Sequence, residues 1–263
     1  MPLLSRPVSG GILSADYSED GVILRLDLVH AAFIFLAAFL VYFWSASRTV
    51  GLEDDGYFIL AAYYNGIAHP PGYPLYTLLA HLATLVPAGS IALRVHLLSG
   101  FLGALACACL WCIARILIRD RAASWAVALA LAFSKVFWSQ ALIAEVYTLN
   151  VFLILTTFLC VLAVRNGGAG RVFGRPVKLL FLCYGLALSN HWPLVLLTTP
   201  MFIAALWQVR NRICQVVMSG LPFLLLGLTP YLWMAIRSQM DPEIVFFGPV
   251  ETFSDFWHYL GRT

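Results

Sequence analysis

The stretch TVGLEDDGYFILAAYYNGIAHPPGYPL, residues 49–75, decides the fold of this chain. It is a polar interval between long apolar runs, and it holds three consecutive acids, Glu53, Asp54 and Asp55, followed by His69 before a proline pair. Carboxylates are costly in the hydrocarbon core of a bilayer, so they must face water, a cavity or a ligand. We therefore expect this interval to lie outside the membrane, between spans, and to carry the chemistry of the protein.

The composition of the whole chain is that of a multi-pass membrane protein. Of its 263 residues, 61% are hydrophobic and 11% are charged, and the mean hydropathy is +0.85. A soluble domain could not bury so much apolar surface. The net charge of +3 comes without a basic run suited to a nucleic-acid backbone, so nucleic acid is excluded as a partner.

The cysteines are all in or at the edge of apolar segments. They are Cys107, Cys109, Cys112, Cys160, Cys183 and Cys214. We expect them to pack as small apolar side chains and to form neither disulfides nor a metal cluster.

Apolar runs separated by polar turns predict seven membrane spans, because about 20 residues cross a bilayer as a helix. The predicted spans are 27–44, 93–118, 122–138, 146–164, two short spans within 179–207, and 214–236. The run 179–207 is expected to break at NHWP, residues 190–193, because proline denies the helix a backbone donor. A single tilted helix there is the alternative. The short segment 73–86, bounded by prolines, is expected to lie at the membrane surface.

Basic residues predict the orientation, because cytoplasmic loops are enriched in arginine and lysine. Eleven of the sixteen basic residues then share the side of the N-terminus: Arg6, Arg25, Arg115, Arg119, Arg121, Arg165, Arg171, Arg175, Lys178, Arg210 and Arg212. We expect a cytoplasmic tail (1–26), a transmembrane domain (27–236) with an outer loop (48–92), and an outer-face tail (237–263) that begins a truncated region. The expected location is a plasma membrane, the inner membrane of a bacterium. The small residues at 45–47 leave removal of the first span as a signal peptide as an alternative.

Five motifs, in this order, resemble those of the membrane O-mannosyltransferase-like family, which belongs to the GT-C class of lipid-linked-sugar glycosyltransferases. They are EDDGYF (53–58), HPPGYPLY (69–76), RVHLLS (94–99), FWSQALIAEVYTLN (137–150) and LALSNHWP (186–193). The resemblance runs from about Thr49 to the end of the chain. It implies an all-helical, multi-pass bundle that moves a hexose, mannose, from a polyprenyl phosphate carrier to a hydroxyl of a protein or glycan acceptor on the outer membrane face.

Two other functions stay open beside this one. Family members are usually longer, so a truncated or non-catalytic membrane subunit is one alternative. Clustered acids and a broken helix are also found in ion- or proton-coupled transporters, which are the second alternative.

The resemblance also implies that an acid of the first outer loop is the catalytic base. On this sequence Asp54 takes the aspartate position of the family motif and Asp55 the small-residue position. Tyr57 stands where the family usually has glutamate. Asp54 is therefore the first candidate for the base and Asp55 the second.

Transfer from a polyprenyl phosphate sugar needs a carboxylate to accept the proton of the acceptor hydroxyl, and donors to hold the leaving phosphate. The predicted topology brings polar residues from four parts of the chain to one outer end. The substrate-binding candidates there are Glu53, His69, Arg94, Glu145, Tyr147, Asn190, His191 and Arg237. For Arg94 a phosphate clamp competes with snorkelling to the headgroups, and for the two histidines a structural role stays open. The acids could also hold one divalent ion, but no metal ligand is assigned.

Overall fold

The computed structural model describes residues 20–166, 174–246, 248 and 250–261, and this part of the chain is built from helices. In chain order they are α1 (Asp20–Ser45), α2 (Asp55–Tyr63), α3 (Pro74–Thr84), α4 (Ile91–Ile118), α5 (Arg121–Ala132), α6 (Lys135–Ala141), α7 (Tyr147–Asn166), α8 (Arg175–Leu206), the 3-10 helix η3 (Trp207–Arg212), α9 (Ile213–Gly227), α10 (Thr229–Ser238) and α11 (Phe253–Gly261). No strand occurs among the described residues, although one isolated bridge joins Ile67 and Val245.

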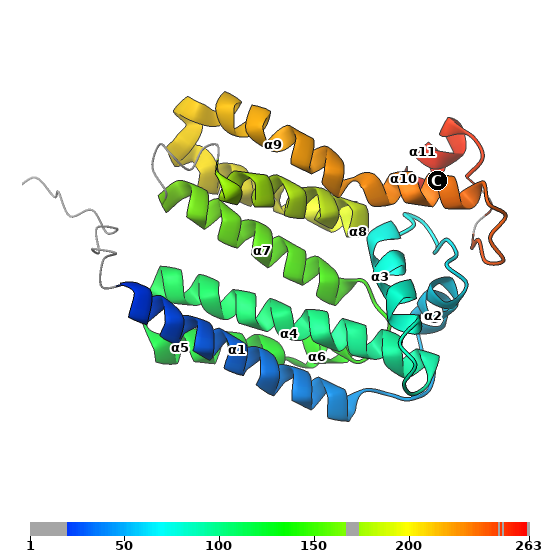
Figure 1. Ribbon diagram of the computed structural model, residues 1–263, viewed down its shortest axis with the longest axis horizontal. Coiled ribbons are helices and arrows are strands. Elements are labelled where there is room, and N and C mark those ends of the chain that lie inside the picture. Colours follow the sequence, from blue (N-terminus) through cyan, green and yellow to red (C-terminus); the bar gives the residue numbers. More distant parts are fainter. Residues whose placement is uncertain (1–19, 167–173, 247, 249, 262–263) are drawn as a thin grey trace, which may run out of the picture.

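The long apolar helices lie side by side and form the body of the molecule (Figure 1). The helix α4 packs against α1, α5 and α7, and α8 packs between α7 and α9. Among the described residues, five helices are long and apolar enough to cross a membrane, or six if α5 and α6 count as one span. The predicted class, an all-helical multi-pass bundle, is confirmed.

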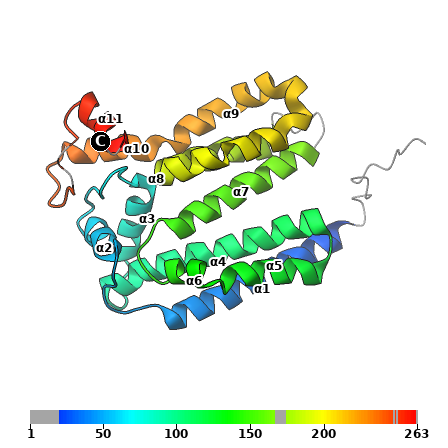
Figure 2. The same ribbon diagram turned by 180° about the vertical axis from the view of Figure 1, so that it is seen from behind.

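Side-chain caps begin three of these helices. Ser90 accepts a hydrogen bond from the N–H of Leu93 at the start of α4, and Asp120 accepts one from Ala123 at the start of α5. Ser134 caps α6 in the same way, which divides the predicted span 122–138 into α5 and α6, bent by 62°. Figure 2 shows this bent pair in front of α4. The predicted span 122–138 is therefore a bent pair of helices that passes as one candidate span, and the bend arises because Ser134 supplies a new helix start inside the apolar run.

The helix α8 folds back on itself at His191, as the NHWP motif predicts. His191 has non-helical backbone angles (φ −149°, ψ 77°). The hydroxyls of Tyr184 and Thr199 form a 2.6 Å hydrogen bond across the turn, although a straight helix would separate these residues by about 22 Å. By length and composition Arg175–Ala204 counts as one candidate span, which gives five or six candidates among the described residues. With the bent pair α5 and α6 taken as one span and the two arms of α8 counted separately, the total is the seven that the sequence predicts.

The short helices α2 and α3 lie together at one end of the bundle and do not run along its length (Figure 1). The helix α3 also contacts α10, and the bridge between Ile67 and Val245 joins the loop after α2 to the segment after α10. The segment 73–86 is not among the candidate spans, and its place at the membrane surface stays a prediction.

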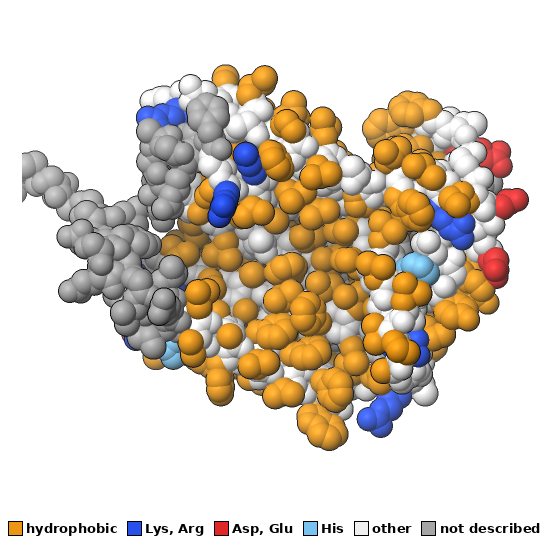
Figure 3. Space-filling view, in the orientation of Figure 1, with side chains coloured by type: hydrophobic (Ala, Val, Ile, Leu, Met, Phe, Trp, Pro, Cys, Tyr) orange, Lys and Arg blue, Asp and Glu red, His pale blue; other side chains and the backbone are white. Residues whose placement is uncertain are grey.

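Charges separate along the bundle. At one end the Nε atoms of Arg115 and Arg121 each lie 3.4 Å from Asp27 Oδ1. On the face that Figure 3 shows, the visible acidic side chains lie at the opposite end, near α10 and α11, and apolar side chains cover the flank between the two ends. An apolar belt between polar ends is what a lipid-embedded bundle requires. Arg6 and Arg171 of the predicted basic set lie outside the described residues.

Candidate functional site

The acidic triplet before α2 is divided between solvent and core. Glu53 is exposed and has a left-handed backbone conformation (φ 63°). The side chain of Asp54 is 48% exposed, whereas Asp55, the first residue of α2, is fully buried. Because of this division, only Glu53 and Asp54 can contact a substrate.

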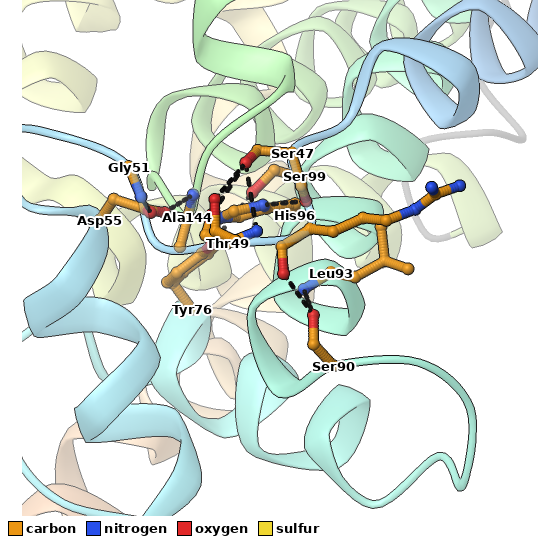
Figure 4. Close-up of polar contacts among 11 residues, drawn as sticks. Ser47, Thr49, Gly51, Asp55, Tyr76, Ser90, Leu93, His96, Ser99 and Ala144 are labelled. Carbon is orange, nitrogen blue, oxygen red and sulfur yellow. Dashed lines mark hydrogen bonds and ion pairs between the residues drawn. The ribbon is translucent and has the colours of Figure 1, made fainter.

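The Asp55 carboxylate accepts hydrogen bonds from three separate parts of the chain (Figure 4). Its Oδ2 accepts the backbone N–H of Gly51. Its Oδ1 accepts the backbone N–H of Ala144 at 2.6 Å and the Nε2–H of His96 at 2.8 Å. Burial alone would raise the pKa of Asp55, but the hydrogen bonds from His96, Gly51 and Ala144 outweigh it and hold the pKa below its ordinary value. Asp55 is thus an ionised anchor, and the geometry does not support the expectation that it is a second catalytic base.

His96 is a residue of this site that the sequence reasoning missed. Its side chain has no exposed surface, and its Nδ1 lies 2.9 Å from the carbonyl oxygen of Ser47. Since its two partners, Ser47 O and ionised Asp55, are both acceptors, both ring nitrogens donate and His96 carries a positive charge. The motif RVHLLS contains it, but a histidine inside an apolar helix is typical of a packing residue. Only its contact with Asp55, 41 residues away in sequence, reveals the role.

Asp54 points to the other side of the loop, towards a row of rings. Its Oδ2 lies 3.5 Å from Nε2 of His69. The ring of His69 lies 5.2 Å from that of Tyr73, Tyr73 lies 5.5 Å from His191, and His191 lies 6.1 Å from Tyr147, all between centroids. Predicted site residues from the first loop, the start of α7 and the turn of α8 therefore do come together.

Glu145 is buried in the turn between α6 and α7, with 4% of its surface exposed. Burial raises its pKa to about 7, and the negative charges of Asp54, Glu53 and Asp55 add to the shift. The backbone N–H of Val146 donates to it and opposes the shift. A carboxyl group with this pKa can hold or release a proton near neutral pH, which is a property of acid–base groups in active sites.

Asn190 connects the turn of α8 to the turn that holds Glu145. Its Nδ2–H donates to the carbonyl oxygen of Val146 at 3.1 Å, while its Oδ1 is buried without a partner among the described residues. This contact joins the two turns that hold His191 and Glu145, while the predicted binding of a substrate by Asn190 stays a prediction.

Two predicted substrate-binding residues, Arg94 and Arg237, donate hydrogen bonds to backbone carbonyl oxygens of the protein itself. The guanidinium group of Arg94 donates to three carbonyl oxygens between Thr84 and Gly89, at 2.7 to 2.9 Å. That of Arg237 donates to the carbonyl oxygens at the C-terminal end of α2. Arg94 therefore closes the loop after α3, and its described contacts differ from both the expected phosphate clamp and the snorkelling alternative.

Within residues 20–166, 174–246, 248 and 250–261, no group of three or more His, Cys, Asp or Glu side chains is arranged to hold a metal ion. A groove of about 370 Å³ lies between α3 and α10 and is lined by Leu78, Thr229, Pro230 and Trp233. The residues that line this groove do not include the acids of the site.

Together the fold and the site define a multi-pass membrane protein with a carboxylate and histidine site at one end of its helical bundle. The family model "Protein O-mannosyl-transferase TMEM260 N-terminal domain" matches residues 54–213, which is more than half of the chain. The chain belongs to this family, and the resemblance seen in the five motifs is confirmed. The match begins at Asp54 and includes His69, Glu145 and His191.

Two relatives carry the name protein O-mannosyl-transferase TMEM260. The protein from Mus musculus is 29% identical over 233 residues, which are 87% of this chain and 33% of the relative. The protein from Dictyostelium discoideum is 26% identical over 249 residues, which are 86% of this chain and 30% of the relative. The chain thus spans about a third of the length of these relatives. No solved structure matches the chain.

Proposed function

We propose that this chain is the membrane-embedded part of a glycosyltransferase that moves mannose from a polyprenyl phosphate carrier to a hydroxyl group of a protein serine or threonine. The printed name of both relatives, protein O-mannosyl-transferase, supports the sugar and the acceptor. The observation that carries the proposal is the meeting of Asp54, His69 and Glu145 at one end of the bundle.

In the proposed reaction Asp54 is the general base. The acceptor oxygen attacks the anomeric carbon while its proton passes to a carboxylate oxygen of Asp54. The bond between the anomeric carbon and the carrier phosphate breaks, and its electron pair leaves with the phosphate. His69, 3.5 Å from Asp54, keeps the carboxylate turned towards the acceptor.

The leaving phosphate requires hydrogen-bond donors, and the histidines of the site can supply them. The Nδ1 of His191 accepts the backbone N–H of Leu194 at 3.4 Å, so a neutral His191 carries its proton on Nε2. We assign phosphate binding to His69 and His191, because the guanidinium groups of Arg94 and Arg237 are held by backbone carbonyls.

The proposed orientation has the N-terminus in the cytoplasm and the site on the outer face. The cluster of Arg115 and Arg121 around Asp27, at the end of the bundle opposite the site, supports it through the enrichment of basic residues on the cytoplasmic side. The acids of the site also lie in loops and at helix starts, whereas the acids of a transporter are expected near the middle of its spans.

The test is sugar transfer by the full-length protein in membranes, measured with a radiolabelled polyprenyl phosphate mannose. Asp54→Asn is expected to lower the rate on the order of 10²-fold or more, because the base is lost while the shape is kept. Glu243→Gln is the matched control, since it removes an exposed carboxylate from the chain just after α10. Transfer by Asp54→Asn at the wild-type rate would contradict the proposal.

A further inference from the structure

The side chains of Asp55 and His96 have no exposed surface, so this buried pair cannot contact a substrate directly. We propose that this pair is a positioning device that sets the separation of the two carboxyl groups of the site, Asp54 and Glu145. The inference rests on the function proposed above and adds to it two residues that act through others.

Asp55 is bonded to both segments that carry the carboxyl groups. Its Oδ1 accepts the N–H of Ala144, and the next residue is Glu145. Asp54 is the residue directly before Asp55. Figure 4 shows the Asp55 side chain between the backbones of Gly51 and Ala144. The Asp54 and Glu145 carboxyl groups are therefore each one residue away from a residue that these contacts hold. A change in the Asp55 contacts would move the two segments relative to each other.

The turn before α2 depends on the same carboxylate. Its Oδ2 accepts the N–H of Gly51 and closes the turn 51–55, in which Glu53 has a φ of 63° that residues other than glycine rarely adopt. A Cβ atom at Gly51 would lie 3.1 Å from Oδ2, so the close approach favours glycine. This closed turn directs Asp54 outward, towards His69.

His96 supplies the opposite charge and links two further segments. It belongs to α4, and its Nδ1–H donates to the carbonyl oxygen of Ser47, in the segment after α1. Both members of the pair have no exposed surface, so neither water nor salt competes for their charges. Removing one member leaves an uncompensated buried charge, which is strongly destabilising. The pair thus joins α2, α4, the segment after α1 and the turn before α7.

A general base is effective only in a narrow range of positions, and a misplacement of about 1 Å can cost 10²-fold in rate. We therefore expect His96→Asn and Asp55→Asn to lower kcat on the order of 10²-fold per folded molecule, with the KM for the donor little changed. A residue with a merely structural role would lower the amount of folded protein and leave kcat per folded molecule unchanged.

The distance between the segments that carry Asp54 and Glu145 can be measured independently of activity, by pulsed electron paramagnetic resonance. Spin labels are attached to Leu52→Cys and Ser139→Cys, two exposed positions on either side of the Asp55–Ala144 bond, in a Cys214→Ser background. We expect a narrow distance distribution in this background and a broader or shifted one when Asp55→Asn or His96→Asn is added. Thr157→Val is the matched control, because it removes a buried hydrogen bond, to the carbonyl oxygen of Leu153, within α7 and away from both labels.

The double variant Asp55→Asn/His96→Asn keeps the test decisive if a single variant does not fold, because it leaves no buried charge unpaired. It should fold and still show the altered distance, since an amide at position 55 brings a donor against the N–H groups that Asp55 accepts. A folded double variant with the wild-type distance distribution would overturn the positioning role. An altered distribution together with no transfer by the wild-type protein would instead overturn the proposed function and support the role of the pair.

Discussion

Asp54 and Asp55 are neighbours in sequence but face opposite environments: the Asp54 side chain is 48% exposed beside His69, and Asp55 is fully buried against His96. Two chemically identical groups therefore have different tasks. One can exchange a proton with a ligand, and the other holds the backbone in place.

The two aspartates should respond differently to the same substitution. We expect Asp55→Asn to lower the free energy of unfolding on the order of 3 kcal/mol, because it leaves the charge of His96 buried and unpaired. Asp54→Asn should change it little, since half of that side chain is in solvent. Thermal unfolding in detergent measures both. Equal losses in the two variants would contradict the division of roles.

Glu145 should make stability depend on pH. Its pKa is about 7 in the folded protein, above the ordinary value of 4.5, so the folded state holds the proton more tightly. The raised pKa of Glu145 makes its full contribution to the free energy of unfolding below about pH 4.5. That contribution, up to about 3 kcal/mol, is lost as the pH rises to 7. Glu145→Gln should remove this part of the slope, so that the variant gains in melting temperature relative to wild type as the pH rises. A parallel decline of the two proteins between pH 4.5 and 7 would show that Glu145 is not the group responsible.

The substitution of Arg94 distinguishes two roles for its guanidinium group: holding the loop after α3 and binding the phosphate of the donor. If its role is to bind the carbonyls between Thr84 and Gly89, Arg94→Met should lower the melting temperature and leave the KM for the donor within about threefold. Loss of a bidentate phosphate contact would instead raise the KM more than tenfold, since a charge-assisted hydrogen bond contributes about 1.5–3 kcal/mol. Melting curves and donor titration separate the two results.

The packing of α8 on α9 requires glycine at a close contact. A Cβ atom at Gly185 would lie 2.5 Å from the carbonyl oxygen of Leu224, and no rotation of a side chain can relieve that contact. Gly185→Ala should therefore destabilise the bundle by roughly 1–3 kcal/mol. Gly56→Ala in α2 is the control, because its Cβ would meet only the flexible Val50 side chain at 3.4 Å. Equal melting temperatures for the two variants would contradict this account of the interface.

The orientation can be measured by labelling from one side. Leu52→Cys is exposed at the site end, and Asn211→Cys is exposed at the opposite end, in a Cys214→Ser background. A maleimide that does not cross membranes should label position 52 in intact cells and position 211 only after permeabilisation. The reverse pattern would put Asp54 in the cytoplasm and contradict an outer-face reaction.

Much of the architecture could be predicted from sequence patterns, because a helix that crosses lipid must be apolar over about 20 residues. Apolar length predicts the spans, and the NHWP motif predicts the reversal of α8 at His191. The bend between α5 and α6 could not be foreseen in the same way, because it depends on a single serine cap inside an apolar run.

The site was only partly predictable for a different reason. The sequence singles out Asp54, His69 and Glu145 as polar residues in unfavourable surroundings, which is a local signal. The roles of Asp55, His96, Arg94 and Arg237 depend on partners distant in sequence or on backbone carbonyls, which no spacing pattern encodes.

The reversal at His191 has a consequence for the surrounding lipid. Its two arms, Arg175 to Asn190 and Trp192 to Leu206, are each roughly 23 Å long, whereas the hydrocarbon layer is about 30 Å thick. A hydrophobic segment that is too short is accommodated by local thinning of the bilayer. The headgroup layer would then lie deeper beside the reversal of α8. The phosphate of a lipid would therefore have a shorter path to the rings of His69 and His191.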